Sequence, residues 1–306
     1  MEQPIEIAVL PRQTMTWSEF LQTPARGIAL DGMVSGGPAW DEKTLHVNFD
    51  HHDGVVREAT MSTEMQVLFA LKGGLMERFG GRARVYVNDP DQDTAFALWL
   101  IMRHKQFSGV QSHPVINRLL ALNDRWDITV GAFPMSLDDQ LVRQHCWAFA
   151  PYTDLRKSGE LATAGSATML NCLRAVMANL DACFMGVAKE KELDTRATVL
   201  HEGARFKIVD EIGGNEARYA LFSQGALSGY ISIVARRPDG RMVYTIGRRS
   251  RYVDFPVPEL YAALSAADDA PWGGSDLIGG SNRARGSKLT WQQVRDIVEV
   301  QCQTRT

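Results

Sequence analysis

The sequence predicts an α/β protein with a parallel-sheet N-terminal domain that carries helices on both faces, plus a smaller α/β C-terminal domain. Three observations support this fold class. In the first half, short apolar runs rich in β-formers alternate with helical patterns, which is typical of a parallel sheet. In the last third, short strand-like runs follow one another closely. The length of 306 residues with 45% hydrophobic content suits two cores, and we expect domains at residues 1–192 and 193–306.

Three apolar runs in the first domain are expected to be strands, and an aspartate follows each one. They cover residues 27–30, 45–49 and 84–88 and precede Asp31, Asp50 and Asp89. Helical patterns at 62–79 and 94–104 come after the second and third runs. Ligands of open parallel sheets bind beyond the carboxyl ends of the strands, so three carboxylates would share one rim. Such a rim favours a bound cation, and the alternative is that the aspartates cap the following helices.

The rest of the chain predicts a helical connector followed by a strand-rich domain. Residues 159–192 are rich in Ala, Leu and Met and are expected to form packed helices. The domain boundary is expected near Glu192. Strands are expected at 204–209, 217–222, 229–235 and 242–246. An Arg-Pro-Asp-Gly turn at 237–240 predicts a hairpin between the last two.

Composition excludes several function classes. The net charge of −3 lacks the basic excess of a protein that tracks long nucleic acid. The N-terminus has no basic region followed by an apolar core, and no stretch approaches the roughly 18 apolar residues of a membrane span. We therefore expect a cytoplasmic protein with no membrane contact. Its four cysteines show no Cys-x-x-Cys spacing and are expected to be buried thiols.

Two polar clusters carry the candidate chemistry. In Asn48–Gly54, the neighbouring His51 and His52 add imidazoles to carboxylates at a strand end, a ligand set suited to a metal such as Mn²⁺. The alternative is a polar turn with one capping aspartate. Asp89–Asp93 places three carboxylates in five residues directly before an apolar helix, and bound cations would remove their repulsion. The alternative here is a solvated acidic turn.

These clusters resemble two motifs of the DHH phosphoesterase superfamily. Asp50-His51-His52 after an apolar strand is similar to the motif that names the family. Residues 89–98 are similar to the family's His-Pro-Asp-Gly-Asp motif and the small-residue helix that follows it. Asp89 stands in the place of the histidine, and a carboxylate can replace an imidazole as a ligand.

Two further aspartates fit the same resemblance. Asp31 precedes Asp50 by 19 residues, similar to the family's spacing from its second-motif aspartate. Asp127, in the segment 127–133, resembles the start of the fourth motif, an Asp-Thr-Gly-Gly-Phe-like turn. In the family the His-Pro-Asp-Gly-Asp motif comes first, whereas here it follows the DHH motif. We therefore expect a rearranged connectivity that builds the same rim from strands in another order.

The C-terminal half carries a second resemblance. Residues 244–251 are similar to the Arg-Ser strand end of the domain that accompanies DHH catalytic domains. Residues 279–287 resemble its Gly-Gly-His-x-x-Ala-Ala-Gly loop, with Ser281 in place of the histidine. Gly-rich backbone permits close approach of an anion, and arginine offers a bidentate phosphate fork. The alternative for these arginines is a solvated basic face.

The resemblance implies a metal-dependent phosphoesterase or phosphohydrolase with two ions of Mn²⁺ or Mg²⁺. The expected metal ligands are Asp31, Asp50, His51, Asp89, Asp91, Asp93 and Asp127. The expected catalytic residues are His52, which would orient water or the phosphate, and Asp91. The expected substrate-binding residues are Arg249, Ser250, Gly279, Gly280, Arg283 and Arg285. The expected substrate is a short nucleotide or a small phosphorylated molecule.

Two rival functions are compatible with the same residues. A DHH-like protein that senses a nucleotide without hydrolysing it would show altered motifs such as Asp89 and Ser281. A metal-free structural domain would use its acidic turns only for solubility. Metal analysis separates the structural domain from the others, and turnover of a phosphodiester with Mn²⁺ separates enzyme from sensor. A homodimer is compatible with each of the three.

Overall fold

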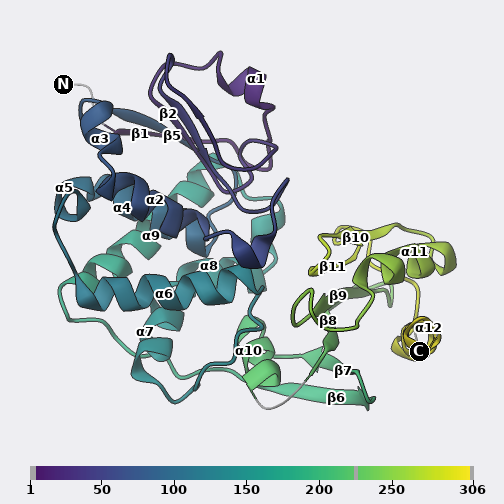
Figure 1. The fold of residues 1–306 in the computed structure, drawn as a ribbon. Coiled ribbons are helices and arrows are strands. Elements are labelled where there is room, and N and C mark those ends of the chain that lie inside the picture. Colours follow the sequence, from purple (N-terminus) through teal and green to yellow (C-terminus); the bar gives the residue numbers. More distant parts are fainter. Residues whose placement is uncertain (1–4, 224–226, 304–306) are drawn as a thin grey trace. The chain divides into compact units, whose positions relative to one another are not determined.

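The computed structural model describes residues 5–223 and 227–303, and it divides into two compact units (Figure 1). Unit 1 comprises Met1–Ile128 and Asp138–Lys191. Unit 2 comprises Thr129–Leu137 and Glu192–Thr306. The chain therefore passes into unit 2 for one short segment before it completes unit 1.

Unit 1 is built on a mostly parallel five-stranded sheet, which confirms the α/β class. Its strand order is β1 (Ile5–Val9), β5 (Ala83–Val87), β2 (Gly27–Leu30), β4 (His46–Phe49) and β3 (Ala39–Asp41). Only β3 is antiparallel to its neighbour. Because β2 is hydrogen-bonded to both β5 and β4, the three strands that precede aspartates end side by side.

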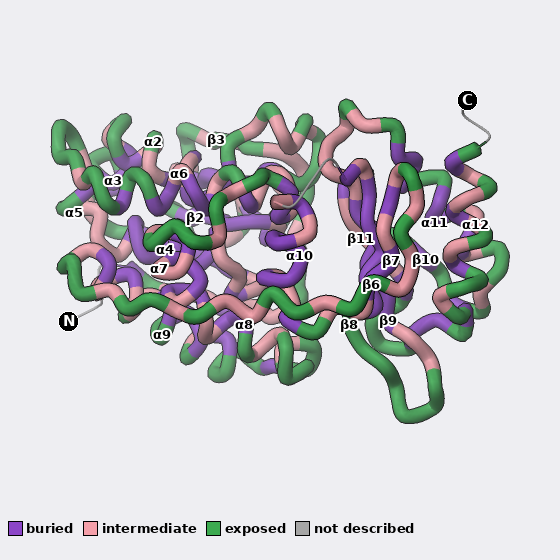
Figure 2. The backbone as a smooth tube through the Cα atoms, turned by 90° about the horizontal axis from the view of Figure 1, so that it is seen from below, coloured by how far each residue is buried: buried purple, intermediate pink, exposed green. Residues whose placement is uncertain are grey.

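The helices of unit 1 cover the two faces of this sheet unequally. They are α1 (Trp17–Phe20), η1 (Arg57–Ala59), α2 (Thr63–Lys72), α3 (Leu75–Arg78), α4 (Gln92–Met102), α5 (His104–Phe107), α6 (Pro114–Ile128), α7 (Gln140–Ala148), α8 (Ala150–Lys157), η2 (Glu160–Ala162) and α9 (Ser166–Phe184). One face packs its Ile28 and Leu30 against α2, α4 and α9, whereas the other packs Ala29 against Phe20 of α1. Figure 2 shows the resulting buried strands and helices inside the unit.

Two helical predictions in unit 1 need correction. The single helix expected at 62–79 is two helices, because α2 ends at Lys72 and Gly74 adopts a left-handed φ of 92°. The region 159–192 holds only the short η2 and the long α9, and residues 187–196 form no regular element. Glycine at a helix end permits the backbone reversal that other residues resist.

Unit 2 contains a six-stranded sheet with helices packed on it. The strand order is β10 (Trp272–Gly274), β11 (Ile278–Ser281), β9 (Met242–Arg248), β8 (Gly229–Arg236), β7 (Phe206–Glu211) and β6 (Ala197–Glu202). The antiparallel pairing of β8 with β9 confirms the predicted hairpin. Val257 and Leu260 of α11 (Val257–Ala267) and Val294 of α12 (Trp291–Gln303) belong to the core that includes Ile231 and Ile246 of the sheet.

The strand expected at 217–222 is wrong, because these residues lie in helix α10 (Asn215–Ser223). Alanine favours helix over strand, and an acidic residue in the first turn, Glu216, suits a helix N-terminus. The buried positions Ala217, Ala220 and Tyr219 then cluster on helical rather than alternating spacing. A six-residue apolar run is too short for its periodicity to distinguish a strand from a helix.

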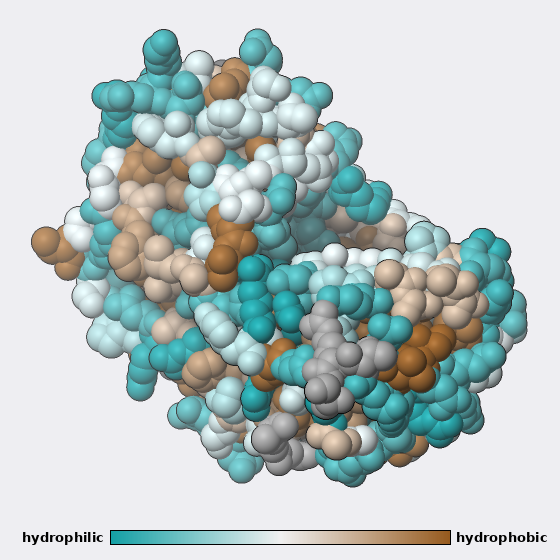
Figure 3. Space-filling model, turned by 45° about the vertical axis from the view of Figure 1, so that its right-hand side comes forward, coloured by the Kyte–Doolittle hydropathy of each residue, from teal (hydrophilic) through white to brown (hydrophobic). Residues whose placement is uncertain are grey.

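The remaining sequence expectations concern cysteines and membrane contact. All four cysteines are buried free thiols, as predicted. Among the described residues, no helix combines the length and apolarity that crossing a bilayer requires. Hydrophilic and hydrophobic residues are interspersed on the face of the molecule in Figure 3.

Candidate metal centre

The candidate site lies in unit 1, where β2, β4 and β5 end. Asp31 and Asp50 follow β2 and β4 directly, and Asp89 follows β5 after Asn88. The acidic turn after β5 leads into α4, and the DHH turn after β4 leads toward α2. Parallel strands present their carboxyl ends at one edge, which is how residues far apart in sequence meet here.

Asp50 builds the turn that carries the two histidines. Its Oδ1 accepts hydrogen bonds from the backbone amides of His51 at 2.8 Å and His52 at 3.1 Å. The same oxygen lies 2.9 Å from His52 Nδ1. Gln66 on α2 donates to the Asp50 carbonyl at 2.9 Å, so the buried turn is held from both sides. Asp50 thereby orders the turn and contacts the His52 imidazole directly.

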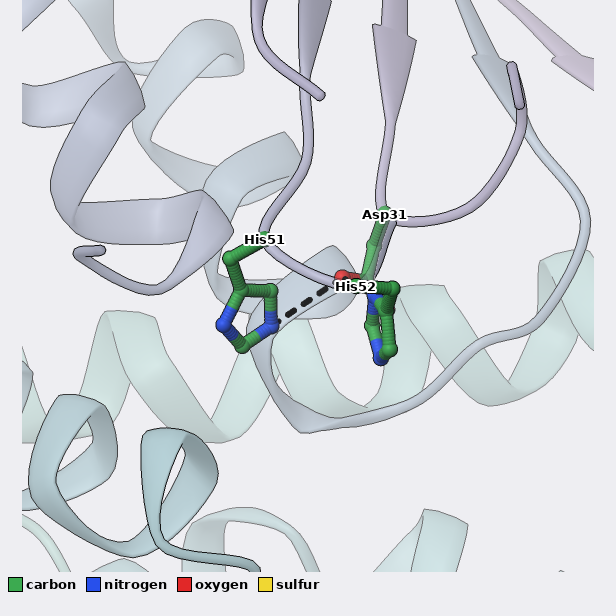
Figure 4. A group of neighbouring side chains, drawn as sticks. All are labelled: Asp31, His51 and His52. Atoms are coloured by element: carbon green, nitrogen blue, oxygen red, sulfur yellow. Dashed lines mark ion pairs between the residues drawn. The ribbon is translucent and has the colours of Figure 1, made fainter. Parts of the chain in front are cut away.

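Asp31 adopts an unusual backbone conformation at the end of β2. Its φ of 44° is left-handed, and Gly32 follows with a φ of 68°. Aspartate tolerates this region better than most residues, and such outliers cluster at functional sites. Thr63 on α2 donates to Asp31 Oδ1 at 3.0 Å. In Figure 4 the dashed line joins His51 to Asp31, and the His52 ring lies beside the same carboxylate, 3.2 Å from Nδ1 to Oδ1.

Asp91 and Asp93 enter the cluster from the start of α4. Asp91 is the N-cap of this helix and accepts from the Thr94 amide at 3.2 Å. Asp93 Oδ1 accepts from the same amide at 3.1 Å. The capping alternative is therefore correct for Asp91, and it coexists with membership of the cluster. Asp93 is only 2% exposed, and its other oxygen, Oδ2, receives no hydrogen bond among the described residues.

Asp127 enters from the last turn of α6, although it is 77 residues from Asp50 in sequence (127 minus 50). Its Oδ2 lies 2.8 Å from His51 Nε2, and Arg57 donates to its Oδ1 at 3.1 Å. Arg57 is a partner that sequence reasoning missed, because a single arginine on a short 3₁₀ helix carries no motif. Its guanidinium places one fixed positive charge against the cluster.

Three groups of side chains in this cluster could hold a metal ion. They are Asp31 with His51 and His52, His51 with Asp93 and Asp127, and Asp31 with Asp91 and Asp93. Within each group the ligand atoms lie within 4.8 Å of one another. Asp31, His51 and Asp93 each belong to two groups. Of the residues expected as ligands, Asp50 and Asp89 belong to none of the three.

The cluster brings more carboxylate oxygens to His51 Nε2 than one N–H can satisfy. His51 Nε2 faces three carboxylate oxygens, at 2.8 Å to Asp127, 3.4 Å to Asp93 and 3.5 Å to Asp31. One imidazole N–H can satisfy one acceptor well but not three. Convergent oxygens with a nearby imidazole form the donor set that Mn²⁺ or another divalent cation accepts.

The electrostatics show how the metal-free cluster balances its charge. Burial opposes the charged form of Asp31, but His52 and His51 hold the pKa of its carboxyl well below the ordinary range. Burial also opposes the charge of His52, yet Asp31 raises its pKa to about 10. For Asp93, burial and then Asp127 and Asp31 raise the pKa to about 7. Protonated imidazoles thus supply positive charge that a divalent cation would otherwise supply.

A buried polar chain adjoins the cluster and was also missed from the sequence. Glu64 in the first turn of α2 accepts from Asn123 Nδ2 at 2.8 Å. Asn123 Oδ1 lies 2.7 Å from His145 Nε2. Burial, followed by Asp93 and Asp127, raises the pKa of Glu64 well above its ordinary value. All three residues are almost fully buried. Glu64 therefore adds a buried carboxyl that interacts with Asp93 and Asp127 of the cluster.

The glycines expected in a substrate loop lie in a strand instead. Gly279 and Gly280 belong to β11, between β10 and β9. A Cβ at 280 would lie 2.0 Å from the carbonyl oxygen of Tyr244, and one at 279 would lie 2.2 Å from that of Gly273. The close approach of strands therefore accounts for both glycines. The expectation of a loop over 279–287 is wrong for its first three residues.

The other expected substrate residues also belong to unit 2, and their roles stay predictions. Arg285 donates to Asp269 at 2.9 Å, and the Ser250 hydroxyl accepts from the Tyr252 amide at 3.2 Å. The Arg249 amide donates to the Ser228 carbonyl, and the Arg283 carbonyl accepts from Arg237.

Comparison of this chain with protein-family models, with curated proteins and with solved structures yields no match.

Proposed function

We propose that this chain is a metal-dependent phosphoesterase of the DHH type that acts on a short nucleotide or a small phosphorylated molecule. The observation that carries the proposal is the sharing of Asp31, His51 and Asp93 among three candidate ligand groups. Ligands shared between adjacent groups would allow two ions to lie close together, as they do in two-metal sites that act on phosphate esters. A structural acidic turn has no reason to bury such a set.

The ligand types favour Mn²⁺ or Mg²⁺. His51, Asp93 and Asp127 would hold one ion, and Asp31, Asp91 and Asp93 would hold the other. Carboxylate ligands suit both metals, and the imidazole favours Mn²⁺ over Mg²⁺. Bound divalent cations would lower the pKa of a water and stabilise charge on the phosphate and leaving oxygens.

The chain's own residues prepare and orient this site. Asp50 holds the turn of His51 and His52, and Thr63 holds the Asp31 carboxylate. The His52 side chain is 40% exposed, so it is the imidazole that substrate or water can reach. We assign it the role of orienting water or the phosphate. Arg57 fixes the Asp127 carboxylate by a direct hydrogen bond.

Unit 2 carries three arginines that the sequence predicts as phosphate-binding residues. Arg249, Arg283 and Arg285 would hold the phosphate or nucleotide end, since arginine matches phosphate geometry with two parallel hydrogen bonds. The net charge of −3 favours a small anionic substrate over a long polymer.

A nucleotide sensor without hydrolytic activity is the second candidate function. It is favoured by Ser281, which stands where the family has histidine and whose hydroxyl accepts from the Tyr244 amide at 2.9 Å. A hydroxyl used in this way, on a residue that is 6% exposed, is tied to the sheet. The sensor would retain metal and nucleotide binding.

The deciding experiment is turnover of a generic phosphodiester and of a panel of short nucleotides with Mn²⁺. Wild type should hydrolyse at least one of them, and His51→Ala and Asp127→Asn should abolish hydrolysis while circular dichroism shows a retained fold. Unchanged turnover in a folded Asp127→Asn variant would contradict the enzyme proposal. No turnover by wild type, together with metal binding that the variants lose, would support the sensor instead.

A further inference from the structure

The loop that follows β1 lies on the same rim of unit 1 as the candidate metal centre. β1 is parallel to β5, so its carboxyl end lies beside Asn88, which directly precedes the acidic turn. The Arg12 amide donates to the Asn88 carbonyl at 3.1 Å. The Asn88 side chain donates to the carbonyls of Gln13 at 2.8 Å and of Gly32 at 3.0 Å. Because Gly32 follows Asp31, the loop is held against the backbone beside two parts of the rim.

Arg12 occupies a backbone position that suits glycine. The Gln13 amide donates to the Leu10 carbonyl at 3.1 Å and closes a turn with Pro11 and Arg12 at its centre. Arg12 has a left-handed φ of 59°. A proline followed by a residue with positive φ is the pattern of a type II turn, which favours glycine at its third position. The turn alone therefore does not account for an arginine, and strain of this kind is often kept for function.

The Arg12 guanidinium is anchored along one edge only. Its Nη1 donates to the Ala164 carbonyl at 2.8 Å, a contact within unit 1. Within residues 5–223 and 227–303 the guanidinium makes this hydrogen bond and no ion pair. The Nε–H and Nη2–H groups point along its other edge and form a fork that matches two oxygens of a phosphate. Arg12 is exposed, so a ligand can reach this fork.

Arg12 and Arg57 differ in what they contact at this rim. Arg57 donates to the Asp127 carboxylate at 3.1 Å, so a candidate ligand balances its charge. Arg12 is anchored on a neutral carbonyl and keeps its full charge. A fixed cation beside a metal centre can stabilise negative charge on phosphate oxygens that the metal ions do not bind. Of these two arginines, Arg12 is the one suited to an anionic ligand.

We propose that Arg12 binds the phosphate of the substrate at the rim of the candidate metal centre, as a phosphate-binding arginine that unit 1 supplies itself. This role deepens the proposed function and rests on it. The fork would bind two phosphate oxygens and orient the group toward the metal ions. Because Arg12 belongs to no ligand group, its loss should weaken phosphate binding without weakening metal binding.

The test is calorimetric titration of the full chain with Mn²⁺ alone and then with inorganic phosphate, using Arg12→Gly and the control Arg26→Gly. Arg26 is also exposed and has a left-handed φ of 67°, but it directly precedes β2, at the opposite edge of the same sheet. The two substitutions therefore remove the same charge and the same kind of backbone strain. Arg12→Lys keeps the charge without the fork, and it serves if Arg12→Gly fails to fold.

Wild type loaded with Mn²⁺ should bind phosphate. Arg12→Gly should lower the phosphate affinity by about tenfold to a hundredfold, the range expected for hydrogen bonds to a charged group. Arg12→Lys should lower it by a smaller factor, because a lysine retains the charge. Arg26→Gly should bind phosphate as wild type does, and the Mn²⁺ affinity should not fall in any of these variants.

Wild-type phosphate affinity in folded Arg12→Gly, or in Arg12→Lys where Arg12→Gly fails to fold, would overturn the role of Arg12 and leave the metal function standing. Equal losses in Arg12→Gly and Arg26→Gly would overturn it too, as would Mn²⁺ binding by wild type without phosphate binding. A parallel loss of Mn²⁺ and phosphate affinity in Arg12→Gly would show a purely structural role. Phosphate binding that needs Arg12 but no Mn²⁺ would support Arg12 and contradict the metal function, and binding of neither ion would contradict both.

Discussion

The Asp91 carboxylate accepts a hydrogen bond from the Thr94 amide at 3.2 Å, so one residue both caps α4 and belongs to the acidic cluster. Burial, followed by Asp93 and Asp31, raises the pKa of Asp91 well above its ordinary value. The charge of Asp91 is therefore unfavourable in the metal-free fold, whereas its hydrogen bond is favourable. Substitutions at Asp91 can separate the effect of its charge from the effect of its hydrogen bond.

Asp91→Asn should leave the metal-free protein at least as stable as wild type, because an amide oxygen also caps a helix and carries no charge. Asp91→Ala should be less stable than Asp91→Asn by about 1 kcal/mol, the usual loss for removing a cap. Urea unfolding in the presence of a chelator measures both values. A loss of stability in Asp91→Asn relative to wild type would contradict charge repulsion at Asp91, and equal stability of the two variants would contradict its role as the cap.

Glu64→Gln should stabilise the metal-free protein at alkaline pH. The raised pKa of Glu64 means that the folded state holds a proton more tightly than the unfolded state. Its contribution to stability is therefore present below the unfolded pKa of about 4.5 and is lost as pH rises through the folded pKa. Glutamine keeps the acceptor for Asn123 and removes the titration.

The measurement is urea unfolding of both proteins at pH 5 and pH 8. The advantage of Glu64→Gln should be larger at pH 8, and the exposed Glu77→Gln should show no such trend. A constant difference between wild type and Glu64→Gln at the two pH values would contradict the assignment of a buried carboxyl with a raised pKa.

His145 should make the protein sensitive to mild acid. Burial lowers the pKa of its imidazole to about 3, and Asn123 Oδ1 accepts from the neutral ring. The unfolded state binds a proton near pH 6.5 and the folded state does not, so stability falls as pH drops below that value. Between neutral pH and pH 5 the loss amounts to about 2 kcal/mol.

His145→Gln should flatten this dependence, because glutamine retains an N–H donor without titrating. His113→Gln, at a partly exposed position, should retain the wild-type pH profile. Thermal melts between pH 5 and pH 7 report the difference. A His145→Gln profile parallel to that of wild type would show that His145 is not the group responsible.

The acidic rim could be predicted because each of its aspartates follows a short apolar run that is visible in the sequence. Asp31, Asp50 and Asp89 each end an apolar run, and parallel strands bring such ends together. What each carboxylate does there could not be predicted. The Asp50 carboxylate accepts hydrogen bonds from the amides of its own turn. That geometry depends on backbone angles that cannot be read from the sequence.

Most of the site residues that could not be predicted from the sequence reach the site through contacts between segments that are distant in the chain. Glu64 and Arg57 join the site only because α2 and η1 pack beside α6, and neither residue carries a motif. The glycines 279 and 280 matched a phosphate loop in composition, yet close strand pairing also demands glycine. Identical residues serve both purposes, so composition alone could not separate them.

Calorimetric titration of the metal-free protein with Mn²⁺ tests the central claim most directly, with Asp93→Asn as the variant and the exposed Asp53→Asn as its control. We predict saturable binding of up to two ions by wild type and Asp53→Asn, and a marked loss for Asp93→Asn, because Asp93 belongs to two ligand groups. Absence of saturable binding to wild type at millimolar Mn²⁺, or equal binding by folded Asp93→Asn, would contradict a metal centre at this rim.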